Sequence, residues 1–329
     1  MNKMKNLATA TALAITFCLA SCNNQNEDPT PAGPAPVRFT ASIGTPDAVA
    51  TPVPRTRAAG TSWAVGDKIG IFMTAHATTN PAEADAVNRQ YTTATGDGSF
   101  TPIMGQELYY PMDNSAVDFI AYYPYTATAT LTEALPITVA TTQTSASQTA
   151  CDYLWASANN SGTGYDKSAT AAVALPFSHS LARLTMNCIV DANVGTDTPA
   201  DGIPSLPADA VVTINGMYTT GSFAPSTGQV SAAATPAAIT PRRLDAPTDA
   251  TKYAATFDAI ILPATYTAAA NVTVSFTIHD ETYVWTVGKM EFKSGNDHIY
   301  EVTITRSGVK AIGTIKDWNQ EIQGGVTAE

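Results

Sequence analysis

Apolar and polar residues alternate with a period of two in many short runs of this chain. The first run places on one face the apolar residues Val37, Phe39, Ala41 and Ile43, with polar residues between them. Such alternation predicts strands that turn one face to a core and the other to solvent. Comparable runs, none of them helical in period, cover residues 68–73, 117–123, 183–190, 257–262, 272–278, 283–287, 300–304 and 309–315.

The runs are separated by residues that favour turns, such as Asp280-Glu281, which predicts a hairpin. Many short strands in a chain of 329 residues predict an all-β protein with two Greek-key β-sandwich domains, over residues 37–168 and 169–329. The join is placed after the Gly/Ser/Asn-rich residues 159–168. Residues 191–210 are the competing boundary, but we interpret them as an insertion between two strands that could pair as neighbours.

The composition fits a secreted β-rich protein. Charged residues make up only 14% of the chain, the net charge is −11, and Thr and Ala are abundant. The 17 Lys and Arg residues are spread thinly. Nucleic acid is therefore not an expected partner, because a phosphate backbone requires a basic patch.

The N-terminus has the pattern of a bacterial lipoprotein signal. Lys3 and Lys5 precede an apolar run over residues 7–20, which is too short for a membrane span. The run ends at Ser21 and Cys22, so we expect residues 1–21 to be removed and Cys22 to carry lipid. Acyl chains would hold the protein at the outer membrane, exposed at the cell surface. Residues 22–36, polar and Pro-rich, are expected to form a flexible tether.

Few residues suggest chemistry. Cys151 and Cys188 could form a disulfide in the oxidising envelope or remain buried thiols, and the sequence leaves both open. The chain has no recognisable metal, hydrolase or nucleotide motif, so we expect no enzyme, no metal and no cofactor. Histidines are interpreted as structural: His76, His179, His279 and His298. Some tyrosines could stack on sugars, although strand packing is favoured for them: Tyr109, Tyr110, Tyr122, Tyr123 and Tyr125.

The order of several short motifs is more specific than any one of them. An Arg38-Phe39-Thr40-Ala41 run is followed by Trp63-Ala64-Val65-Gly66-Asp67, and later by Tyr109-Tyr110-Pro111 and Asp152-Tyr153-Leu154-Trp155. Further motifs lie at residues 117–124, 175–184 and 295–300. In this order they resemble the fimbrillin family, the subunits of type V pili, over most of the chain after Val37.

The resemblance implies two transthyretin-like β-sandwich domains and a lipoprotein precursor. It also implies that an Arg-specific surface protease removes the first strand. Arg55 and Arg57 match that position, in a Pro-rich linker where exposed backbone would be accessible. A plain loop with two arginines is the alternative. The implied partners are other fimbrial subunits, the protease, the outer membrane and a host or bacterial surface ligand.

Strand physics suggests how such subunits would join. A sheet that loses an edge strand exposes backbone groups and an apolar groove, which a strand from another subunit can fill. The candidate donor residues are Val309, Ala311, Gly313 and Ile315. Pairing of this run within its own domain is the alternative. The competing function is a glycan-binding outer-membrane surface lipoprotein, motivated by the tyrosines and the tether.

Overall fold

The computed structural model describes residues 33–44, 62–191, 194, 205–233, 235–267 and 272–318. The described residues from Pro34 onward belong to one compact unit by their contacts. The all-β prediction is confirmed, because strands dominate and the described helices are one short α-helix and one 3₁₀ turn, η1 (Asn160–Gly162). Within these ranges, no helix has the length and apolar character needed to cross a membrane.

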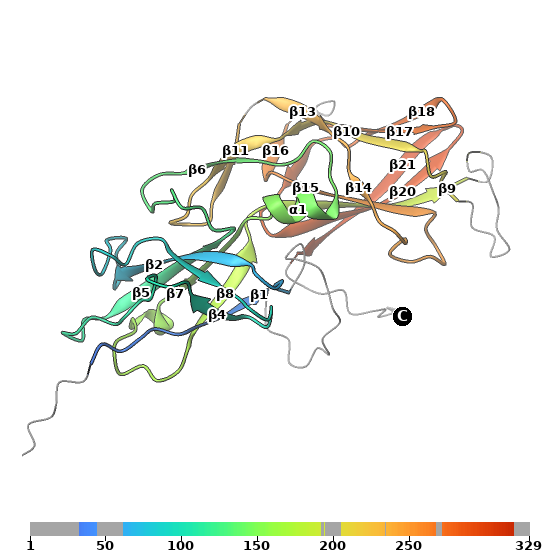
Figure 1. Ribbon diagram of the computed structural model, residues 1–329. Coiled ribbons are helices and arrows are strands. Elements are labelled where there is room, and N and C mark those ends of the chain that lie inside the picture. Colours follow the sequence, from blue (N-terminus) through green and yellow to red (C-terminus); the bar gives the residue numbers. More distant parts are fainter. Residues whose placement is uncertain are drawn as a thin grey trace, which may run out of the picture. The chain divides into compact units, whose positions relative to one another are not determined.

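Seven strands close into a barrel by hydrogen bonding, in the order β1-β4-β3-β2-β5-β7-β8 (Figure 1). The sandwich expected for the first domain is therefore a closed ring of strands in this structure. The barrel strands are β1 (Phe39–Ile43), β2 (Lys68–Ala75), β3 (Arg89–Thr92), β4 (Ser99–Pro102), β5 (Val117–Tyr123), β7 (Leu154–Ala158) and β8 (Val173–His179).

Two barrel strands, β2 and β5, are buried on both faces, which explains their nearly continuous apolar sequence. Ile71 and Phe119 point into the barrel core. On the opposite face, Phe72 and Tyr122 join a second core together with Phe223. A strand that buries both faces loses the simple alternation that β1 keeps.

The remaining strands form four sheets. The five-stranded sheet has the order β14 (Arg242–Arg243), β15 (Ala255–Ile261), β9 (Ala182–Val190), β20 (Asn296–Thr305) and β21 (Gly308–Asp317). The four-stranded sheet has the order β13 (Pro236–Ile239), β10 (Val211–Tyr218), β17 (Thr273–Ile278) and β18 (Glu281–Thr286). The three-stranded sheet has the order β12 (Val230–Ala232), β11 (Thr220–Phe223) and β6 (Leu135–Thr138). The two-stranded sheet pairs β16 (Ala264–Tyr266) with β19 (Met290–Phe292).

The predicted hairpin is confirmed, but its turn lies one residue earlier than expected. β17 and β18 pair from Thr273 opposite Thr286 to Ile278 opposite Glu281. His279 and Asp280 form the turn with φ of 50° and 65°. Two positive φ values in a two-residue loop fit the right-handed twist of the strands. His279 is thus a turn residue rather than a strand residue.

The helix α1 (Ser145–Cys151) has no counterpart among the elements that the sequence predicts. Its N-cap is Thr144, whose side chain accepts a hydrogen bond from the Ser147 backbone N–H, while the Ser147 side chain accepts one from the Thr144 N–H. This reciprocal pair satisfies two donors at the helix start. With only seven residues, the helix has too little periodicity to be detected.

Strand pairing bears on two predictions about the domain organisation. The join expected near residue 169 falls before β8, but β8 pairs with β1 and β7 and completes the barrel. β6, in contrast, lies before this join and pairs with β11 from the later part of the chain. The residues 191–210 connect β9 with β10, which lie in different sheets and are not neighbours. Composition could not reveal either result, because pairing partners are distant in sequence.

Candidate functional site

β1 closes the barrel by pairing with strands from distant parts of the chain. It runs parallel to β8 over five residue pairs and antiparallel to β4 (Figure 1). Backbone hydrogen bonds continue beyond both ends of β1. The Val37 N–H donates to the Leu108 carbonyl and the Gly44 N–H donates to the Phe177 carbonyl, each at 2.9 Å. Without β1, backbone groups of β4 and β8 would lose their partners.

The predicted apolar face of β1 is confirmed as a buried face. Its four residues are at most 7% exposed: Val37, Phe39, Ala41 and Ile43. The Phe39 ring meets Tyr91 and Phe119 edge to face, with both centroid distances at 5.1 Å. This is a favoured arrangement of aromatic rings. Loss of β1 would therefore open an apolar groove in addition to an unpaired backbone.

Trp63, at the start of the next described segment, also fixes β1. Its indole Nε1–H donates to the Ala41 carbonyl at 2.9 Å. The ring packs edge to face against Phe100 and Phe177, with centroids 5.0 and 5.1 Å apart. Trp63 therefore joins β1 to the two strands that flank it. The sequence pattern could not identify this role, because one tryptophan outside an alternating run has no periodicity.

The backbone of Gly98 approaches β1 more closely than a side chain would allow. Its φ is 88°, and its carbonyl accepts a hydrogen bond from the Ala41 N–H at 2.7 Å. A Cβ at this position would lie 2.4 Å from the Ala41 carbonyl oxygen, a backbone atom. Gly98 is thus required both by its φ and by the close strand.

We expect Gly98→Ala to lower the free energy of unfolding by about 1–3 kcal/mol more than Gly105→Ala does. Both glycines have positive φ, but the Gly105 Cβ position has no atom within 4 Å. The two variants therefore share the φ penalty, and only Gly98→Ala displaces β1. Urea denaturation of both measures the difference. If both variants lose the same free energy of unfolding, the added Cβ at position 98 displaces β1 without destabilising the barrel.

The predicted lipidation and processing residues, Cys22, Arg55 and Arg57, lie outside the described residues. The described chain leaves β1 at Gly44 and resumes at Ser62. Both arginines therefore fall in the only covalent connection between β1 and the later barrel strands. A cut at either one would leave β1 attached to the barrel through non-covalent contacts alone.

The candidate donor run is β21, at the edge of the five-stranded sheet. It pairs antiparallel with β20 over ten residues (Figure 1). Val309 and Ala311 are half-buried, whereas Ile312 is 61% exposed and Ile315 is 54% exposed. In the single chain this run therefore pairs within its own sheet, which was the alternative to a donor role. A donor role stays a prediction.

A stack of rings fixes the end of β21. The Trp318 indole lies parallel to the His179 imidazole, with centroids 3.9 Å apart and an interplanar angle of 6°. His179 Nδ1 is 2.8 Å from Asp152 Oδ1, and both side chains are fully buried. Burial raises the pKa of Asp152, while the neighbouring His179 lowers it. Arg183 lies 5.4 Å from the Trp318 ring centre and pairs with Asp297.

The sequence analysis did not find this cluster. Asp297 lies in β20, is 3% exposed and pairs with Arg183. The structural role proposed for His179 fits its buried pairing with Asp152. Contacts between residues so far apart in sequence leave no local signal.

Cys151 and Cys188 are both free and buried, so they form no disulfide. Burial raises the pKa of Cys151 to about 11 and that of Cys188 to about 12. Both thiols therefore stay protonated near neutral pH, which makes them poor nucleophiles and metal ligands. In the described part of the chain, no three His, Cys, Asp or Glu residues gather as a metal site.

The packing role favoured for the tyrosines is confirmed at Tyr110, Tyr122 and Tyr123, which are at most 5% exposed. The Tyr122 hydroxyl donates to Asn88 Oδ1 or to the Thr126 carbonyl, both at 2.8 Å. Burial raises the pKa of Tyr122 and also raises that of Tyr110 to about 12. These rings are not available to stack on a sugar.

Comparison with known proteins identifies relatives over nearly the whole chain. Residues 56–318 match the model of the fimbrillin-like family. A Bacteroides uniformis protein named "Putative fimbrium subunit Fim1C" is 29% identical over 331 residues, which cover 98% of this chain and 99% of that protein.

Two crystal structures have a similar fold. One, of a "putative cell adhesion protein" from Bacteroides uniformis, has 26% identity and a TM-score of 0.61, and covers 86% of this chain and 98% of its own. Another protein so described, from Bacteroides ovatus, has 24% identity and a TM-score of 0.65, and covers 88% and 99%. Because the family model spans most of its length, the chain belongs to the fimbrillin-like family.

Proposed function

We propose that this protein is a structural subunit of cell-surface fimbriae that serves adhesion and has no catalytic activity. The names of its relatives, a fimbrium subunit and a cell adhesion protein, support this role. The observation that carries the proposal is the placement of β1. It is fully built into the barrel, yet only the segment with Arg55 and Arg57 connects it to the later strands.

Assembly would proceed by strand replacement. An Arg-specific surface protease cuts after Arg55 or Arg57, and β1 then leaves the barrel. The vacated place offers unpaired backbone from β4 and β8 and an apolar groove lined by Tyr91 and Phe119. A strand from a second subunit satisfies both at once, since backbone bonds supply affinity and side-chain pockets supply specificity.

β21 is the strand of this chain that best fits as donor. It is an edge strand with two exposed isoleucines, so it loses little buried surface on leaving its own sheet. Val309 and Ile315 have the same six-residue separation as Val37 and Ile43. Aligned in this way, Ala311 takes the place of Phe39 and leaves part of the Phe39 ring volume unfilled. Gly313 takes the place of Ala41.

Export would place the cleavage and the strand replacement at the cell surface. Cys22 would carry the lipid that holds the precursor at the outer membrane. A cut after Arg55 or Arg57 would remove the lipid together with β1. The same cleavage would then release the subunit and open its groove.

Treatment of the unlipidated chain with an Arg-specific protease tests this proposal. We expect a fragment that starts at Thr56 or Ala58, followed by multimers visible by size-exclusion chromatography and light scattering. A variant with both Arg55→Gln and Arg57→Gln should stay intact and monomeric. A deletion of residues 308–329 should be cut but fail to multimerise. A cut wild-type chain that stays monomeric would contradict strand replacement.

A further inference from the structure

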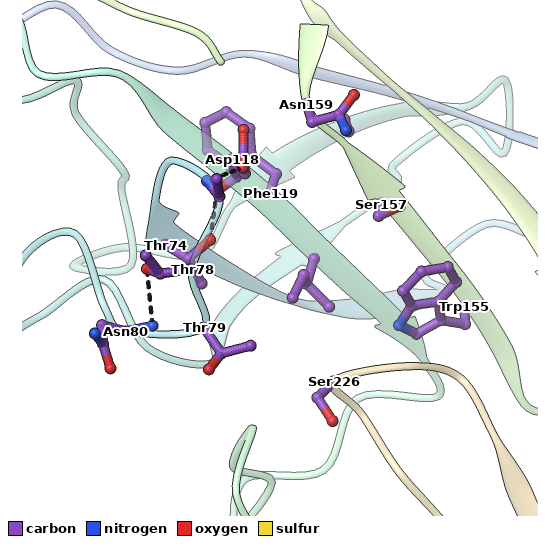
Figure 2. Close-up of a pocket in the computed structure, with 13 residues that line it drawn as sticks. Thr74, Thr78, Thr79, Asn80, Asp118, Phe119, Trp155, Ser157, Asn159 and Ser226 are labelled. Carbon is purple, nitrogen blue, oxygen red and sulfur yellow. Dashed lines mark hydrogen bonds between the residues drawn. The ribbon is translucent and has the colours of Figure 1, made fainter. Parts of the chain in front are cut away.

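An open pocket lies on the outer face of the barrel, away from β1. Its volume is about 590 Å³, within the range of small-molecule sites. Its lining comes from β2, β5 and β7, from the loop after β2 and from Ser226. Figure 2 shows Trp155 on one side and Thr78, Thr79 and Asn80 on the other.

Trp155 forms a fixed aromatic wall of this pocket. Its indole Nε1–H donates to the Pro225 carbonyl at 2.9 Å. The backbone of Gly228 packs against the ring, because a Cβ there would lie 2.6 Å from Trp155 Cγ. The ring is therefore held in place before any ligand arrives, which lowers the entropy cost of binding.

The rest of the rim is rich in hydroxyl and amide groups. Within the described structure, the side-chain polar groups of Asn80, Ser157 and Ser226 make no hydrogen bond to the protein. Ser157 is an exposed residue of β7, and its hydroxyl lies on the same side of the pocket as Trp155 (Figure 2). Hydrogen-bonding groups beside an aromatic face match the alternating hydroxyl and C–H surfaces of a sugar ring.

The charge of the pocket restricts the ligand further. Among the described residues that line it, Asp118 is the only charged one, and none is Lys or Arg. Both Asp118 oxygens are near His76 Nδ1, at 3.0 and 3.1 Å, and Oδ2 accepts from the Ala77 N–H at 2.8 Å. The pocket thus offers no cation to pair with an acidic sugar.

From these observations we infer that this pocket binds a neutral oligosaccharide, stacked on Trp155 and hydrogen-bonded to Asn80, Ser157 and Ser226. The site is distinct from the tyrosines considered in the sequence, because none of them lines this pocket. It uses neither β1 nor β21, so it does not depend on strand replacement. It would give a fimbrial subunit a direct contact with a glycan-coated surface.

The test uses the unlipidated full chain on an array of neutral and acidic oligosaccharides, with affinities measured by calorimetry. We expect binding to neutral glycans only. Ser157→Arg should weaken it at least tenfold, because the long side chain fills the pocket from an exposed strand position. Thr101→Arg, which also introduces an arginine at an exposed strand position but in β4, should leave the affinity unchanged.

Trp155→Ala should reduce affinity roughly tenfold through lost stacking, while Trp155→Phe should retain most of it. Circular dichroism and urea denaturation check that each variant folds. Absence of neutral-glycan binding, preference for acidic glycans, or unchanged binding by a folded Ser157→Arg variant would each overturn the inference. Protease-triggered assembly of Ser157→Arg should be normal, which separates this site from the proposed assembly mechanism.

Discussion

Phe39→Ala is expected to lower the free energy of unfolding by about 3–5 kcal/mol, the usual cost of truncating a buried phenylalanine. The Phe39 ring is 3% exposed and touches both Tyr91 and Phe119. Removing it leaves a cavity at the first residue of β1, the strand that closes the barrel. Urea denaturation followed by tryptophan fluorescence measures the loss.

Thr40→Ala is the matched control for Phe39→Ala. Thr40 is the next residue of β1 and is exposed, so its truncation should change stability by no more than about 0.5 kcal/mol. After cleavage at Arg55 or Arg57, Phe39→Ala should also speed the release of the β1 peptide, and Thr40→Ala should not. If both variants lose the same free energy of unfolding, Phe39 does not hold β1 in the barrel more strongly than an exposed residue does.

Trp318→Ala should lower the free energy of unfolding by about 3–5 kcal/mol and loosen β21. Trp318 is 3% exposed, and its ring is stacked on His179. The backbone N–H of Trp318, which the variant keeps, donates to the Gly295 carbonyl at 2.7 Å, just beyond the last residue of β21. Without the indole, the edge strand keeps its bonds to β20 but loses its terminal anchor.

Hydrogen exchange of the β21 amides checks this prediction. Exchange over Gly308–Asp317 should be faster in Trp318→Ala, while Ile315→Ala should leave it nearly unchanged because Ile315 is 54% exposed. If β21 is the donor strand, Trp318→Ala should also assemble faster after cleavage. Unchanged protection of β21 in Trp318→Ala would show that Trp318 is not its anchor.

Several parts of the fold were predictable because their signal is local. The alternation of β1 and the two runs of the β17–β18 hairpin identified strands with the correct buried faces. β2 and β5 were recognised as strands, but their burial on both faces was not expected. The outer faces of β2 and β5 are buried because other strands pack against them. The sequence of one strand does not show which strands will cover it.

The all-β character of this protein and the apolar face of β1 follow from the sequence alone. The sequence also places Arg55 and Arg57 between β1 and the later barrel strands, since composition, alternation and order along the chain require no knowledge of contacts. That β8 closes the barrel and that Trp318 stacks on His179 is evident only from the folded chain. These are pairings between distant segments, selected by burial and hydrogen bonding in the folded chain, and no local pattern encodes them.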